Sequence, residues 1–136
     1  MNMQLPPVDG FLDPEEAALG RKLLNDGYLI EPVADPAALH RIRDTIAAIA
    51  AGHLERPPSE DAGAFLDGIH EAVDATALNA LRMAAINGLN GEPWARPAYY
   101  ALARPLLSAV VGNELAMQRR LNLSIQLPGD DSSLLA

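Results

Sequence analysis

The most regular pattern of apolar and polar positions lies near the end of the chain, over residues 117–127. Apart from Arg119, its odd positions are apolar and its even positions are polar. Side chains alternate between two faces along a β-strand, so the pattern predicts a strand with one apolar and one polar face. Residues 28–33 form a shorter β-like run. A two-stranded sheet is marginal alone, so we expect the missing neighbours beyond Ala136 or in a second copy.

The other apolar positions follow helical spacing between clear start signals. Asp13 and Pro14 predict a capped helix start, and Gly27 predicts its left-handed end. Asp35 and Pro36 repeat the start signal for a second helix, over residues 36–51. The apolar stripe of that helix is Leu39, Ile42, Ile46 and Ile49.

The middle of the chain is predicted to be helical with two interruptions. Residues 53–61 contain two prolines and several charges, which are typical of an exposed loop. Helix resumes near residue 62 in two pieces, the second capped by Asp74. Residues 87–93 contain Gly88 and predict a break.

These elements predict an α+β fold that is mostly helical. We expect an irregular N-terminal arm over residues 1–12, because Pro6 and Pro7 disfavour regular structure there. Residues 13–136 then form a helical portion with strands near 28–33 and 116–127. The unpaired strand suggests that this domain is incomplete.

Composition and charge narrow the classes of function. The 136 residues suit one domain, and a chain with 49% hydrophobic but 4% aromatic residues builds its core from small aliphatic side chains. A net charge of −8 disfavours nucleic acid and anionic membranes as partners. The absence of cysteine removes disulfides and thiolate chemistry and fits a cytoplasmic protein. We find no signal peptide and no transmembrane span in the sequence.

Candidate chemistry is sparse. The three histidines, His40, His53 and His70, have no metal-binding spacing, and we interpret them as surface residues. No serine lies in a nucleophile motif. We therefore name no catalytic residue and no metal ligand. The aromatic cluster Trp94, Tyr99 and Tyr100 is interpreted as a core anchor, with a ligand wall or a subunit contact as alternatives.

Two stretches resemble a known family. Residues 111–135, VGNELAMQRRLNLSIQLPGDDSSLL, resemble the segment ahead of the iron site in a bacterial group of 2-oxoglutarate/iron(II) oxygenases. This group is similar to phytanoyl-CoA dioxygenases and is associated with surface-polysaccharide biosynthesis. Residues 24–30, LNDGYLI, resemble the helix-to-strand step that opens such oxygenases.

The resemblance implies the first strands of a double-stranded β-helix. In the family, an H-x-D motif shortly after this strand and a distal His hold Fe(II) as a facial triad, and a later Arg binds 2-oxoglutarate. None of these ligands is in this chain, so Fe(II) and 2-oxoglutarate are expected only for a full-length protein that hydroxylates a small-molecule or sugar-type substrate. This chain is then an inactive N-terminal fragment.

The resemblance also implies candidate site residues. The even face of residues 117–127 would look into the barrel, where it would contact cosubstrate or substrate, and otherwise it is simply solvated. Its candidate residues are Arg120, Asn122, Ser124 and Gln126. The alternative function is a standalone helical interaction or dimerisation module. In either case we expect the strand edge to bind a second copy or a missing C-terminal part.

Overall fold

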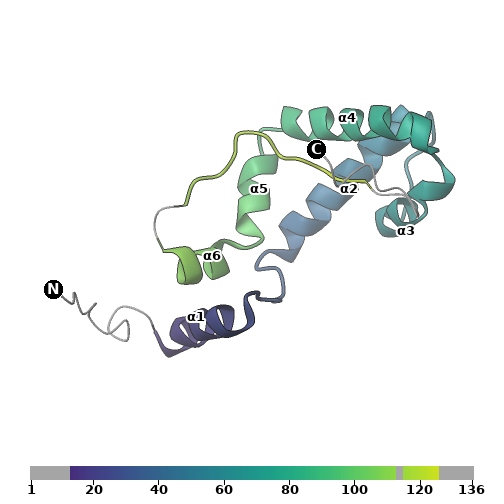
Figure 1. Cartoon of the computed structure of the whole chain (residues 1–136). Helices are drawn as coiled ribbons and strands as arrows, with labels where there is room; N and C mark the ends of the chain where they lie inside the picture. Colours follow the sequence, from purple (N-terminus) through teal and green to yellow (C-terminus); the bar gives the residue numbers. More distant parts are fainter. Residues whose placement is uncertain (1–12, 113–114, 126–136) are drawn as a thin grey trace.

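The structure, a computed structural model, describes residues 13–112 and 115–125, and these residues are mostly helical (Figure 1). A short 3₁₀ turn, η2, lies between two of the helices. The elements, in chain order, are α1 (Pro14–Asp26), α2 (Pro36–His53), α3 (Ala62–Asp67), η2 (Ile69–Glu71), α4 (Ala75–Gly91), α5 (Ala95–Ala101) and α6 (Arg104–Val111).

The helix ends confirm the capping signals in the sequence. The Asp13 carboxylate accepts hydrogen bonds from the backbone N–H groups of Glu15 and Glu16 at 2.8 and 2.9 Å. Glu16 accepts in return from the Asp13 N–H at 3.1 Å, which completes a capping box. Gly27 ends α1 with a φ of 77°, a left-handed conformation that suits glycine. Local sequence therefore sets both ends of α1.

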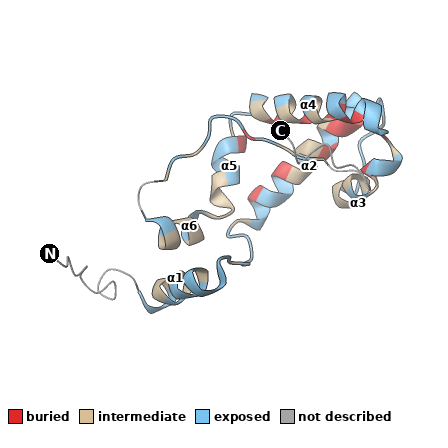
Figure 2. Cartoon of the chain, viewed as in Figure 1, coloured by how far each residue is buried: buried red, intermediate tan, exposed pale blue. Residues whose placement is uncertain are grey.

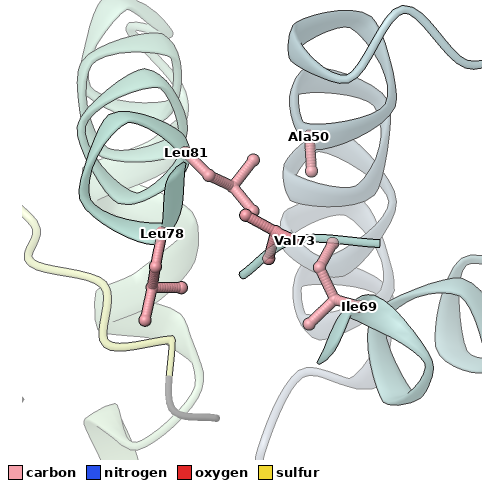
Figure 3. Packing of buried hydrophobic residues seen from close by; sticks show 5 residues of the cluster. All are labelled: Ala50, Ile69, Val73, Leu78 and Leu81. Carbon is pink, nitrogen blue, oxygen red and sulfur yellow. The ribbon is translucent and has the colours of Figure 1, made fainter. Parts of the chain in front are cut away.

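The core lies where α2 meets α3, η2 and α4. Figure 3 shows Leu81 of α4 directed toward α2, where Ala50 lies, and Leu78, Ile69 and Val73 belong to the same cluster. Leu78 and Leu81 are the largest fully buried side chains across the described ranges. A second cluster, Leu89, Ala95 and Leu121, lies where α4 and α5 meet the C-terminal segment. Buried residues are scarce elsewhere (Figure 2).

Helix α2 buries smaller residues than its apolar stripe predicts. Ile42 is buried as expected, but Leu39 is 37% exposed. The most buried positions of α2 are Ala50 and Ala51, with 0% and 1% exposure. Alanine lets neighbouring helices approach closely but buries little apolar area, so this core is thin, as the composition predicts.

The pair α1 and α6 lies apart from the main core (Figure 1). Helix α1 has no buried residue. Leu24, Tyr28 and Ile30 are 85, 63 and 78% exposed, so the end of α1 and the chain after it present apolar side chains to solvent.

The break predicted at residues 87–93 is wrong for its first five residues, because α4 continues to Gly91. Gly88 lies inside the helix, beside Ile49 of α2. A Cβ atom placed on Gly88 would lie 2.7 Å from Ile49 Cδ1, which is closer than atoms can pack. The glycine is therefore explained by helix packing and not by a turn.

The two predicted strands are not seen in the described part of the chain. Residues 28–33 run as an irregular connection, and the segment from 115 to 125 forms no β-ladder. The physical reason is that, among the residues described, neither stretch has a backbone hydrogen-bond partner. Side chains of α4 and α5 bond the later stretch instead. Residues 126 and 127 of the predicted strand, and the predicted arm over 1–12, lie outside the described residues.

No helix within residues 13–112 and 115–125 is long and apolar enough to cross a membrane.

Candidate functional site

The segment 117–125, here called the docked segment, lies along α4 and α5 (Figure 1). Apart from Arg119, which is exposed, burial alternates along it as the sequence predicts. Met117, Leu123 and Ile125 are half-buried and Leu121 is buried, with 7% exposure. The even positions are all exposed. The docked segment therefore has the two-faced character of a strand, although no strand lies beside it in the described residues.

Asn90 of α4 takes the place of a neighbouring strand. Its Oδ1 accepts a hydrogen bond from the Leu121 N–H at 2.8 Å, and its Nδ2 donates to the Leu121 C=O at 2.8 Å. Two facing residues of an antiparallel sheet exchange the same two bonds. Nδ2 also donates to the Ile86 C=O of α4 at 2.7 Å, which fixes the orientation of the amide. One side chain thus satisfies both backbone groups of Leu121.

Two arginines bond other carbonyl groups of the docked segment. Arg82 of α4 donates from Nε to the Ile125 C=O at 2.8 Å, and its Nη2 donates to the same oxygen. Arg96 of α5 donates from Nε to the Gln118 C=O at 3.0 Å and from Nη2 to the Met117 C=O at 3.1 Å. Charged donors make stronger hydrogen bonds than neutral ones, so both ends of the segment are held.

The spacing of these contacts along α4 matches their spacing along the docked segment. Arg82 and Asn90 lie eight residues apart on α4, which spans about 12 Å along a helix. Leu121 and Ile125 lie four residues apart, which spans about 13 Å in an extended chain. Leu121 is bonded by the later helical residue and Ile125 by the earlier one, so the docked segment runs antiparallel to α4.

Within the described residues, nothing bonds the opposite edge of the docked segment. Along a strand, the backbone groups of successive residues point to opposite edges. Leu121 and Ile125 direct theirs at α4. Asn122 and Ser124 therefore direct theirs away from α4, and their backbone groups have no hydrogen bond within the described residues. This edge has the donors and acceptors that a neighbouring strand would need.

The predicted site residues share this exposed face. Arg120, Asn122 and Ser124 are exposed, and Gln126 lies outside the described residues. Arg120 is partly engaged, because its Nη2 donates to Asn87 Oδ1 at 2.9 Å. The structure thus places three of the four side chains on one exposed face of the chain.

The aromatic cluster divides into two parts. Trp94 packs against the cluster of Leu89, Ala95 and Leu121, as a core anchor would. Its Nε1 donates to Glu92 at 2.7 Å, and the Arg41 guanidinium lies 3.9 Å from its ring centroid.

The tyrosines instead line an open groove of about 800 Å³ between α5, α6 and residues 115–117. Tyr99 is 54% exposed there. The walls of the groove are largely apolar and include Leu102, Leu107 and Met117.

The histidines do not form a metal site in the part of the chain that is described. His40, His53 and His70 are exposed, and no group of three His, Cys, Asp or Glu side chains is placed to bind a metal there. The His70 Nδ1 lies 3.0 Å from the Asp67 C=O, and its Nε2 lies 4.0 Å from Glu71. The described residues therefore form no iron site, and the family resemblance implies none within this chain.

Sequence reasoning did not single out Arg82, Asn90 and Arg96. Polar residues on an amphipathic helix normally face solvent, so nothing distinguishes them locally. The one available signal is the eight-residue spacing of Arg82 and Asn90, which matches four residues of an extended segment.

No family model, curated protein or solved structure matches this chain.

Proposed function

We propose that this chain is the N-terminal helical support and an outer strand of a 2-oxoglutarate/iron(II) oxygenase, and that it has no activity alone. The observation that carries the proposal is the docked segment. Its apolar face packs on helices, its polar face is exposed and its far edge has no backbone hydrogen bond within the described residues. A strand in the wall of a helix-backed barrel needs these three properties. The resemblance of residues 111–135 supports the same assignment.

In this proposal the even face of the docked segment borders the substrate space. Arg120, Asn122, Ser124 and Gln126 are then the contacts for cosubstrate or for a small-molecule or sugar-type substrate. When bound, iron and 2-oxoglutarate would supply the oxidising chemistry. The described residues do not form a set of iron ligands, so the part of this chain is to position the strand. We place such an enzyme in the cytoplasm.

The test uses the product of the whole reading frame that contains this chain. Succinate formation from 2-oxoglutarate is measured with and without Fe(II), and we expect turnover that requires the metal. Asn122→Ala should raise the KM for 2-oxoglutarate or for substrate, whereas Asn79→Ala, an exposed change on α4, should not. A reading frame that stops at codon 136, or a folded product without iron-dependent turnover, would refute the proposal.

The open edge also favours a second candidate, a helical interaction module without catalytic activity. A strand edge with unpaired backbone groups recruits another strand whatever the surrounding chemistry. The sequence of residues 121–125 indicates which partner strand fits this edge best.

A further inference from the structure

We infer that the open edge of the docked segment pairs antiparallel with the same edge of a second copy of this chain, with the two-fold axis at Leu123. The inference rests on the second candidate function, strand pairing by an interaction module, because a barrel strand would cover the same edge. It does not rest on the oxygenase chemistry.

Self-pairing at this edge is possible because the segment is already extended and held on its other side. Asn90 and Arg82 bond Leu121 and Ile125 from α4. A partner would therefore not pay the conformational entropy of ordering this strand. It would meet the N–H and C=O groups of Asn122 and Ser124, which alternate as in a regular strand edge.

The side chains fit this register. With the two-fold axis at Leu123, Asn122 lies opposite Ser124 of the second copy, and their backbone groups exchange hydrogen bonds. On the other face Leu121 lies opposite Ile125, and Leu123 lies opposite itself. Apolar residues meet apolar residues and polar residues meet polar residues, which is the favourable pattern for cross-strand pairs.

Registers shifted toward the N-terminal end of the segment are worse. With the two-fold axis at Asn122, the paired stretch has to include Arg120. The chain bends at Arg119 and Arg120, so it is not extended there as pairing requires. An axis at Arg120 places two like charges directly opposite each other, which is destabilising. The axis at Leu123 pairs residues 121–125 alone and leaves both arginines outside. A self-complementary stretch of this kind is what a two-fold interface requires.

Because the chain has no cysteine, single cysteines can report the register directly. Residues opposite each other in a pair without hydrogen bonds have Cα atoms about 4.5 Å apart, within the range of about 4.4–6.8 Å that a disulfide spans. Leu123→Cys should therefore form a disulfide-linked dimer on mild oxidation. Asn122 lies diagonal to its own copy at about 7–8 Å, so Asn122→Cys alone should cross-link poorly. A mixture of Asn122→Cys and Ser124→Cys should cross-link well. Cross-linking of Asn122→Cys alone that matches Leu123→Cys would overturn the register.

Charges at the axis give an independent test in solution. By analytical ultracentrifugation, the unmodified 14.5 kDa chain should sediment as a dimer. Leu123→Asp and Leu123→Lys should each sediment as monomers, because each places like charges at the axis. An equimolar mixture of the two should restore the dimer, which also shows that both variants fold. An unmodified chain that remains monomeric, or a Leu123→Asp variant that dimerises alone, would refute self-pairing. Neither result depends on succinate formation, so the two proposals fail separately.

Discussion

Replacing Asn90 by alanine tests whether α4 side chains, and not a neighbouring strand, hold the docked segment. The change removes the acceptor for the Leu121 N–H and the donor to the Leu121 C=O. Leu121 is buried, so water reaches its released backbone groups only if the segment moves away from α4. We therefore expect local detachment of the segment and not loss of the helices.

The two bonds set the size of the effect. Each contributes about 0.5–1.5 kcal/mol net, so together they contribute about 1–3 kcal/mol to docking. At about 1.4 kcal/mol for each factor of ten, the population of the detached segment should rise roughly 5- to 140-fold. The helices α2 and α4 keep their own cluster around Leu81, so the urea midpoint of global unfolding should change much less.

Hydrogen exchange at the Leu121 amide measures this population directly. Trp94 is the only tryptophan and packs beside Leu121, so its fluorescence gives a second readout. The matched control is Asn79→Ala, an exposed asparagine on the same helix with the same gain in helix propensity. If the Leu121 amide exchanges equally fast in both variants, Asn90 does not hold the segment and the reasoning fails.

Three further substitutions test the core and the caps by urea unfolding. Gly88→Ala should lower the free energy of unfolding by about 1–3 kcal/mol, because the added Cβ meets Ile49. At Gly52 an added Cβ has no atom within 4 Å, so Gly52→Ala should be neutral or raise the free energy of unfolding by up to about 1 kcal/mol. Equal effects of the two glycine substitutions would contradict the close packing of α2 and α4. Leu81→Ala, at a position with 0% exposure, should cost about 2–5 kcal/mol, and a loss under about 1 kcal/mol would show that the main cluster is not the core. Asp35→Ala should cost about 1 kcal/mol by removing the cap of α2, and an unchanged urea midpoint would argue against that cap.

The helices could be predicted because their signals are local. An acid before a proline, as at Asp13 and Asp35, bonds backbone groups within the next three residues, whatever the rest of the chain does. The left-handed end at Gly27 is equally local. Gly88 was misread because its reason is not local. Its partner Ile49 lies on another helix, and a single sequence does not record which helices touch.

The strand was predicted in part for a similar reason. Alternation at residues 117–125 correctly gave the buried and exposed faces, since it reports only the side chains. A strand is defined by its backbone partners, which alternation does not identify. In the described residues those partners are Asn90 and the two arginines. Polar residues on a helix look alike in the sequence whether they meet water or a carbonyl group.

The docked segment links the stability of the helices to what covers its open edge. Leu121 belongs to one buried cluster, and Ile125 packs against the other, so the segment contributes to both. A second copy or a barrel strand that binds only the docked form stabilises that form by mass action. The helical layer should therefore become more stable as the edge is occupied. Asn90 bonds one edge of the docked segment, and the backbone groups of Asn122 and Ser124 are presented at the other edge. The segment is therefore already extended when its partner strand binds.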